Sequence, residues 1–184
     1  LTTADNWQDH RDKTGWEERN NRISISALPP RHYRLPGWMG IPDIYGSWIF
    51  DAVKRGRQMI KQQPVSVIYS TAKPYSNHLV ALILHKMSRL PLVIEFRDEW
   101  TRLPFQSYSP VRRFIEKRQE RSVIDAAAAV IANTPGQQEN FINHYPEIPA
   151  SRFHMIPNGF DPADFQSIPS APSREGPVLL TYVG

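Results

Sequence analysis

Two clusters of polar side chains mark the places where this chain could do chemistry. Each cluster directly follows a short apolar run, at residues 65–69 and 92–96. Hydroxyl and charged side chains gathered in this way could contact a ligand, and a lysine among them could approach a phosphate or an acidic acceptor. The clusters contain Ser70, Thr71 and Lys73 after the first run, and Arg97 and Asp98 after the second.

Arg97 and Asp98 form the leading candidate pair. Burying an ion pair in a core is costly, so opposite charges at the end of a strand favour a functional role. The competing interpretation is a salt bridge that only locks the loop. His78 stands at the start of an apolar segment, where its ring could face the hydroxyls of an acceptor or could simply be a satisfied polar group.

Several other kinds of chemistry find no support in the sequence. The chain has no cysteine, which excludes disulfides and thiolate metal sites. It has no Gly-x-Ser-x-Gly turn and no complete glycine-rich phosphate-binding loop. The histidines lack paired ligand spacing, so we predict no metal site. They are His10, His32, His78, His85, His144 and His154.

The two apolar runs and the segment between them predict the unit that positions the clusters. Both runs are rich in β-branched residues and too short for helices, which is typical of buried parallel strands. The segment between them has helical length, starts at Pro74 and is apolar almost all round at residues 79–84. Strand, helix and strand make a right-handed βαβ unit, and parallel sheets bind ligands at the carboxyl ends of their strands. Both clusters should therefore line one cleft.

The same alternation of apolar runs and helical stripes extends along the chain. It predicts an α/β, Rossmann-like, mostly parallel sheet with helices on both faces. The run at residues 126–132 contains four alanines and could be helical by propensity, but its short length favours a strand. We expect strands near residues 22–27, 65–70, 91–97, 128–133 and 153–156, and helices at 43–62, 111–124 and from 135 to about 145.

Two of these helices bear on function. The helix at residues 111–124 is basic and could rest on an anionic membrane surface, although its glutamates could equally pair with basic neighbours on a solvated face. Thr134 is predicted to cap the helix that starts at Pro135, with Gln137 completing a capping box at the edge of the cleft. For the basic helix, we expect an inward stripe at Val111, Phe114, Ile115 and Ser122.

Composition places the chain among ordinary globular proteins. Its 184 residues are 40% hydrophobic and 22% charged, which suits one domain with a sizeable core. No run of 18 or more apolar residues and no signal peptide are visible, and the lack of cysteine fits a cytoplasmic protein. The net charge of +4 can favour anionic partners such as sugar nucleotides, lipid headgroups or nucleic acid, or can simply keep the surface soluble.

At the two clusters, the chain resembles glycosyltransferase family 4 enzymes, which have the two-domain GT-B fold. Residues 70–78 (STAKPYSNH) are similar to the family pattern ST.PP.S.H, and residues 91–100 (PLVIEFRDEW) to P.V..FRD.W. Many retaining relatives carry a histidine where Arg97 stands, and this chain departs from them there. The resemblance runs from about Pro42 to Gly184 and includes the patterns PD....W...A from Pro42 to Ala52 and IPNG.D...F from Ile156 to Phe165.

The resemblance implies retaining transfer of a sugar from a nucleotide-sugar donor to a hydroxyl acceptor, in polysaccharide or glycolipid synthesis. Arg97, Asp98 and His78 would orient the acceptor and polar groups near the sugar. No metal, other cofactor or nucleic acid is expected. The acceptor could be lipid-linked, and the protein would be cytoplasmic, with peripheral contact at the inner face of the membrane. The residues expected to bind the acceptor are Ser70, Thr71, Lys73 and Thr134.

The resemblance also predicts how the chain is divided. Residues 1–167 would form an N-terminal, acceptor-side domain, residues 168–177 a linker, and residues 178–184 the first strand of a second, donor-binding domain. The second domain would hold most of the donor. We therefore expect residues 1–184 alone to show no sugar transfer and no saturable donor binding below about the millimolar level.

Two other classes of function stay open at this point. One is a sugar-nucleotide epimerase, which shares the GT-B architecture and would interconvert epimers without an acceptor. The other is a non-catalytic domain that binds lipid or another anion, which the net positive charge suggests. Salt-sensitive binding without sugar turnover would favour the second alternative.

Overall fold

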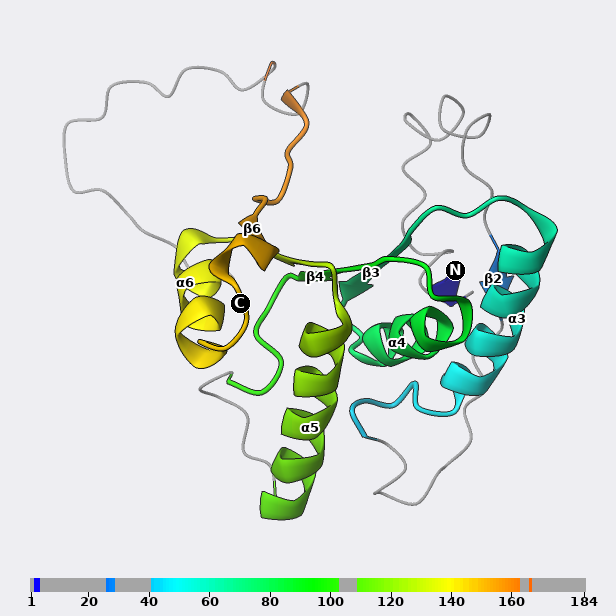
Figure 1. Ribbon diagram of the computed structural model, residues 1–184, viewed down its shortest axis with the longest axis horizontal. Coiled ribbons are helices and arrows are strands. Elements are labelled where there is room, and N and C mark those ends of the chain that lie inside the picture. Colours follow the sequence, from blue (N-terminus) through cyan, green and yellow to red (C-terminus); the bar gives the residue numbers. More distant parts are fainter. Residues whose placement is uncertain (1, 4–25, 29–40, 103–108, 163–165, 167–184) are drawn as a thin grey trace.

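A four-stranded parallel sheet is the centre of the fold (Figure 1). The computed structural model describes residues 2–3, 26–28, 41–102, 109–162 and 166. The strands of the sheet lie in the order β3-β4-β5-β6, and every neighbouring pair is parallel. Their bounds are Ile68–Ala72 for β3, Leu92–Phe96 for β4, Ala129–Ala132 for β5 and Phe153–Met155 for β6.

A second, smaller pair of strands stands apart from this sheet. β1 (Thr2–Thr3) and β2 (Ala27–Leu28) pair with each other in parallel. The strand expected near residues 22–27 falls mostly outside the described residues. What is described of it pairs with β1, so the prediction of one sheet containing all five strands was wrong for this segment.

Helices connect the strands of the main sheet in chain order. Because right-handed crossovers between sequential neighbours all pass over the same side, α4, α5 and α6 should share one face of the sheet. Figure 1 shows these three helices on one side of the strands. The α/β, Rossmann-like class with a parallel sheet is thus confirmed, although the three helices that connect its strands share one face and do not cover both. The helices are α3 (Trp48–Gln62), α4 (Ser76–Ser88), α5 (Pro110–Ala126) and α6 (Pro135–His144), and a 3-10 helix (Ala150–Arg152) precedes β6.

Fully buried and half-buried side chains alternate along β4, because successive residues belong to opposite faces of the sheet. Leu92, Ile94 and Phe96 are fully buried and pack in the core with residues of α4, α5 and α6. Val93 and Glu95 point to the second face and are only half-buried. Successive residues of a strand point to opposite faces, so position along the strand decides which neighbours a side chain meets.

Element boundaries follow hydrogen bonds rather than the ends of apolar runs. The strand expected near residues 65–70 begins only at Ile68, whose N–H donates to Pro91 O at 2.9 Å, and it continues through Ala72. Ser70 and Thr71 therefore lie inside β3 and not in the loop after it. Similarly, Ala126 ends α5, so β5 is shorter than the apolar run at residues 126–132.

The predicted inward stripe of α5 was wrong. Val111 is 69% exposed and Phe114 is 61% exposed, while Glu116 and Glu120 are each only 1% exposed. The C-terminal half of the helix buries Val123 and Ile124 in the core. Glu120 stands three and four positions before them, and Glu116 seven and eight, so both glutamates share the buried face of the helix. Burial raises the pKa of both glutamates, and Arg112 Nε donates to Glu116 Oε1 at 2.7 Å.

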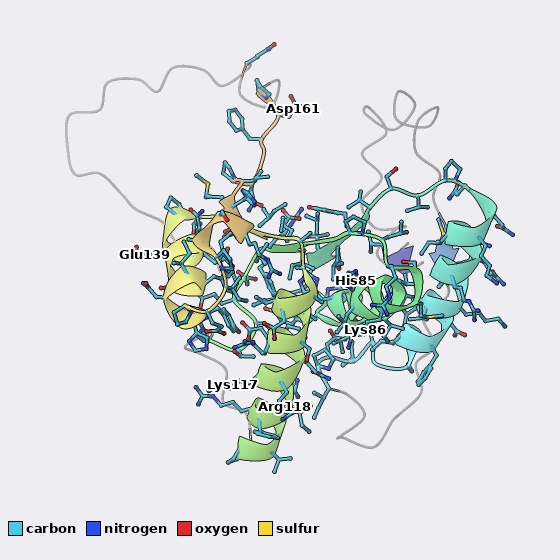
Figure 2. All side chains as sticks on the ribbon, viewed as in Figure 1. His85, Lys86, Lys117, Arg118, Glu139 and Asp161 are labelled. Atoms are coloured by element: carbon cyan, nitrogen blue, oxygen red, sulfur yellow. The ribbon has the colours of Figure 1, made fainter. Side chains whose placement is uncertain are left out.

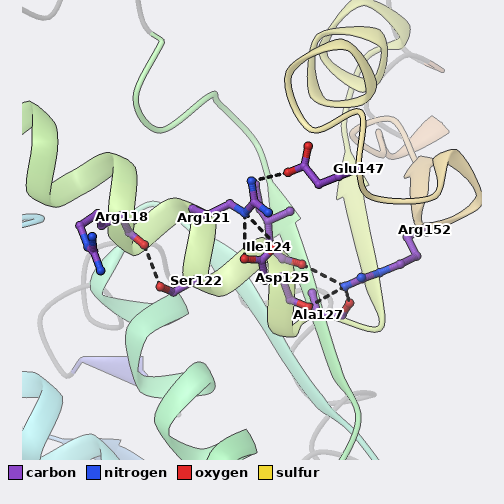
Figure 3. Close-up of polar contacts among 8 residues, drawn as sticks. All are labelled: Arg118, Arg121, Ser122, Ile124, Asp125, Ala127, Glu147 and Arg152. Atoms are coloured by element: carbon purple, nitrogen blue, oxygen red, sulfur yellow. Dashed lines mark hydrogen bonds and ion pairs between the residues drawn. The ribbon is translucent and has the colours of Figure 1, made fainter.

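Polar contacts fix the C-terminal end of α5 (Figure 3). The Arg152 guanidinium donates to the carbonyl oxygens of Ile124 at 3.0 Å and Asp125 at 3.1 Å, and also to that of Ala127. Arg121 forms ion pairs with Asp125 at 2.8 Å and with Glu147. Cations at a helix C-terminus satisfy the last carbonyls and oppose the helix dipole, so this cluster has a structural role.

A close contact joins α3 to α4. Trp48 and Ala52 of α3 are buried against Val80 and Leu84 of α4. A Cβ at Gly56 would lie 2.6 Å from a methyl of Leu84, so a larger residue at this position would force the Leu84 side chain to shift. No helix within the described ranges is long and apolar enough to span a membrane.

Candidate functional site

An ion pair joins the ends of β3 and β4. Ala72 lies beside Phe96 in the sheet, and one residue beyond Ala72, Lys73 Nζ approaches Asp98 Oδ2 at 2.9 Å. The side chains of Lys73 and Asp98 are 50% and 49% exposed, so both charges remain accessible to a ligand. The sequence suggested Arg97 as the partner of Asp98, whereas the ion pair that Asp98 forms here is with Lys73. Both predicted clusters thus meet at the carboxyl ends of their strands.

An aromatic stack holds the two segments that carry this pair. The rings of Tyr75 and Trp100 are nearly parallel, with centroids 4.9 Å apart. The Tyr75 hydroxyl donates to Glu99 O at 3.0 Å, and Asn140 Nδ2 of α6 donates to Glu99 Oε1 at 2.7 Å. Because Tyr75 and Trp100 are also buried, the segments after β3 and β4 are fixed to each other.

His78 lies under this edge of the sheet and is completely buried. Its Nδ1 shares a hydrogen bond of 2.9 Å with Ser70 Oγ, and its ring meets Phe96 edge-on at 4.7 Å. Burial lowers the pKa of His78 to about 3, so the ring is neutral near pH 7. Nε2 has no hydrogen-bond partner among the described residues. The side chain does not reach the surface here, and its role towards an acceptor stays a prediction.

A second polar group occupies the opposite face of the same two strands. The Tyr69 hydroxyl donates to Glu95 Oε2, and Thr71 lies beside Glu95 in the register of the sheet. Burial and this hydrogen bond raise the pKa of Tyr69 to about 12. Burial alone would raise the pKa of Glu95, but hydrogen bonds from Tyr69 and Thr71 and the charge of Arg97 lower it overall.

Tyr69 and Glu95 escaped the sequence analysis because they lie within strands and not after them. The available signal was the alternation of residues along each strand, which places Tyr69, Thr71 and Glu95 on one face once the register is known. Ser70 points to the other face, together with His78. The predicted acceptor residues Ser70 and Thr71 are therefore neighbours in sequence that serve different sides of the sheet.

Thr134 stands at the end of β5, one strand further along the edge. Its Oγ1 accepts a hydrogen bond from Gln137 N at 3.2 Å, which confirms that Thr134 caps α6. The Gln137 side chain reaches back to the N–H of Asn133 at 2.9 Å, one residue before the cap. Thr134 thus has a structural task, and its contact with an acceptor remains a prediction.

An apolar groove of about 420 Å³ opens beside β3. The residues that line it include the polar Ser70, Thr71 and Asn77 and the apolar Trp48 and Leu84. Asn77 Nδ2 donates to Thr71 O at 3.2 Å, which ties the start of α4 to the end of β3. Ligand sites of this kind combine a mainly apolar wall with a few polar groups.

The described residues also bear on metal binding and on the charge of the edge. Across residues 41–102 and 109–162, no three His, Asp or Glu side chains gather as metal ligands would.

Lys73 and Arg97 are the cationic groups that follow β3 and β4, and both are exposed. Positive groups at this position could meet the phosphates or hydroxyls of a ligand, whereas the Arg152 guanidinium already donates hydrogen bonds to backbone carbonyls.

Comparison with known families agrees with this geometry. The glycosyl transferase 4-like domain matches the chain over residues 2–159, which includes the whole four-stranded sheet and both polar clusters. No curated protein matches the chain significantly. The match begins about forty residues before the motifs that carried the resemblance in the sequence. The chain therefore belongs to the glycosyl transferase 4-like domain family, and this membership supports a glycosyltransferase type of function in general.

Proposed function

We propose that this protein transfers a sugar, with retention of configuration, from a nucleotide-sugar donor to a hydroxyl acceptor. The observation that carries the proposal is the half-exposed Lys73–Asp98 ion pair, which lies where β3 and β4 end in a Rossmann-like sheet. Exposed ion pairs add only about 0–1 kcal/mol to stability, so stability does not account for its placement. Parallel sheets bind ligands at this edge.

The residues at the edge would work mainly by positioning the acceptor. Asp98 would accept a hydrogen bond from the acceptor hydroxyl, while Lys73 and Arg97 would meet negative or polar groups near the donor sugar. His78 is neutral and buried, so it would act through Ser70 rather than as a titrating base. Holding two reactants in the right geometry can remove a large part of a barrier, and no residue here needs to act as a general acid.

The donor would be held chiefly by a second domain, which the sequence from residue 178 onward was expected to begin. Those residues lie outside the part of the chain that the structure describes. The acceptor would be a polysaccharide or a lipid-linked molecule. This division leaves the described domain the task of presenting the acceptor hydroxyl at the ends of β3 and β4.

The test compares two carboxylates of similar exposure in the full-length protein. Asp98 is 49% exposed and pairs with Lys73, while Asp125 is 47% exposed and pairs with Arg121. We expect Asp98→Ala to lower turnover at least about tenfold, a loss of about 1.4 kcal/mol of transition-state stabilisation, and Asp125→Ala to leave turnover unchanged. Both variants should keep the wild-type circular dichroism spectrum.

The assay uses a panel of UDP-, GDP- and ADP-sugars, and NMR of the product reports the configuration at the anomeric carbon. Equal turnover of a folded Asp98→Ala variant and the wild type would show that the Lys73–Asp98 pair is only structural. Inversion at the anomeric carbon would contradict the retaining mechanism. Conversion of a donor to its epimer without any acceptor would replace the proposal with the epimerase alternative.

A further inference from the structure

The helix α4 starts without a capping side chain of its own. Tyr75, the residue before it, makes no side-chain hydrogen bond to the first turn and instead stacks on Trp100. Ser109 and Thr134, in contrast, cap α5 and α6. The first N–H groups of a helix have no partner within the helix, so those of α4 need an acceptor from another part of the chain.

Asp43, which precedes α3 in the chain, supplies this acceptor. Its Oδ2 accepts a hydrogen bond at 2.8 Å from the N–H of Ser76, the first residue of α4, and its Oδ1 accepts one from the N–H of Tyr45 at 3.0 Å. The second bond closes a turn between Asp43 and its own backbone, which fixes the carboxylate. A negative charge is favourable at a helix N-terminus, and Ser76 is fully buried, so loss of Asp43 would leave its N–H without a partner.

The helix α5 holds the backbone next to this carboxylate. Arg112 Nη2 donates to Pro42 O at 2.8 Å, and Arg112 Nε donates to Glu116 Oε1 at 2.7 Å. Glu116 is buried, and burying a carboxylate is costly unless a partner compensates for it. Here that carboxylate orients the guanidinium that reaches Pro42. The position of Asp43 is thus fixed by α5 as well as by its own turn.

We propose that Asp43 is a positioning residue for the Lys73–Asp98 pair. Lys73 stands between the end of β3 and Ser76, and the contact of Asp43 with Ser76 fixes the far end of this short segment. A half-exposed ion pair is too weak to hold its own geometry. Loss of the Asp43 carboxylate would therefore let Lys73 move relative to Asp98. Asp43 acts through the backbone of Ser76 and does not touch the ligand.

The first arm of the experiment needs no turnover. NMR of the full-length protein measures hydrogen exchange at the Ser76 N–H and the indole N–H signal of Trp100, whose ring stacks on Tyr75. We expect Asp43→Ala to speed exchange at Ser76 at least about tenfold and to shift the Trp100 signal. Asp43→Asn keeps one carbonyl oxygen and loses the charge, so its changes should be smaller but in the same direction. Asp43→Asn carries the comparison if Asp43→Ala does not fold.

The second arm measures turnover, and only this arm rests on the proposed function. The donors are UDP-, GDP- and ADP-sugars, and the acceptors are octyl glycosides of glucose, galactose and mannose. We expect Asp43→Ala to lower kcat/KM for the acceptor at least about tenfold, with KM for the donor within about twofold of the wild-type value. A variant that merely folds less completely would contain less active enzyme, without a change in either KM.

His85→Ala is the matched control, because it disturbs the opposite end of the same helix. Figure 2 labels His85 and Lys86, which lie in the last turn of α4. His85 Nδ1 donates to Leu90 O at 2.7 Å, so the variant loosens the C-terminal end of α4 and keeps the contact between Asp43 and Ser76. Exchange at Ser76 and kcat/KM for the acceptor should stay within about twofold of the wild-type values. Thermal unfolding confirms that the variants are folded at the assay temperature.

Three outcomes would overturn the proposal. The first is a wild-type exchange rate at Ser76 and a wild-type Trp100 signal in folded Asp43→Ala. The second is faster exchange at Ser76 with an unchanged kcat/KM for the acceptor, which would make the contact purely structural. The third is an equal loss in His85→Ala, which would show a general loosening of α4. Absence of transfer by the wild type would count against the proposed function alone, and the NMR arm would then decide whether Asp43 fixes the segment that carries Lys73.

Discussion

Two charged clusters of this protein look alike in sequence but differ in what they bind. At the ends of β3 and β4, Lys73 and Asp98 contact each other and stay half-exposed. At the end of α5, the Arg152 guanidinium donates to the carbonyl oxygens of Ile124, Asp125 and Ala127 (Figure 3). One cluster is held by side chains alone, whereas the other completes the hydrogen bonds of a helix.

The difference shows how to separate a structural charge from one that is available to a ligand. The last carbonyls of a helix lack partners within the helix, so a cation that bonds them contributes to stability. An exposed ion pair contributes little, because water screens it and two long side chains must be ordered. Charge in the sequence is therefore not evidence of function until its partners are known.

The largest effect that would test this comparison is expected at Arg152. Arg152→Ala removes hydrogen bonds from a charged donor to three carbonyl oxygens, so the free energy of unfolding should fall by about 2–3 kcal/mol. Urea denaturation measures this change. Turnover per folded molecule should stay at the wild-type value. The control is Arg121→Ala. Loss of its half-exposed ion pairs should lower the free energy of unfolding by less than about 1 kcal/mol. A loss of turnover in folded Arg152→Ala would show that the α5 cluster also serves catalysis.

The next effect concerns His78, which lies beneath the Lys73–Asp98 edge. Its pKa is lowered to about 3 in the folded protein, while in the unfolded chain it is near 6.5. The unfolded state therefore binds the proton first, and stability is lost as the pH falls below 6.5. At pH 5 this histidine alone should cost about 2 kcal/mol relative to pH 7.

Denaturation at pH 7 and pH 5 measures this loss, and His78→Gln should remove most of it. Val80→Ala is a suitable control, because it also weakens the interior of α4 but keeps His78. It should be less stable than the wild type at both pH values, with the wild-type difference between them. Titration of the His78 ring near pH 6.5 by NMR would contradict its burial.

The smallest effect on stability is expected at Lys73. Lys73→Met leaves Asp98 exposed to water, so the free energy of unfolding should change by less than about 1 kcal/mol. Turnover should nevertheless fall, and the double variant Lys73→Met with Asp98→Ala should lose less than the product of the two single losses. Independent losses would mean that the two residues do not act as a pair.

Most elements of the fold could be predicted from the sequence, because periodicity follows from backbone geometry. β4 was expected near residues 91–97 and spans the apolar run at 92–96, and Thr134 caps α6 as expected. Boundaries were less accurate where pairing decides them. β3 begins at Ile68 because the Ile68 N–H makes its first hydrogen bond to the neighbouring strand, at Pro91 O. The residues at 65–67 continue the pattern of the run, so the sequence does not show where this pairing starts.

The candidate site could be predicted only in part. The sequence placed Lys73 and Asp98 at neighbouring strand ends, but it paired Asp98 with Arg97, its neighbour in the chain. Which charges meet at neighbouring strand ends depends on the register of β3 and β4, so a neighbour in the chain need not be the partner in space. For the same reason the sequence did not reveal the contact between Tyr69 and Glu95, which become partners only through the register of β3 and β4.

The sequence by itself determined the alternation of strands and helices, the order of the polar clusters and the family motifs, because these depend on local periodicity and residue type. The tertiary structure alone decided which side chains are buried and which charges meet. Glu116 and Glu120 are buried because Val123 and Ile124 set the rotation of α5, and His78 is neutral because Phe96 and Ser70 enclose it. Burial and pairing depend on contacts between residues far apart in the chain, which no local pattern contains.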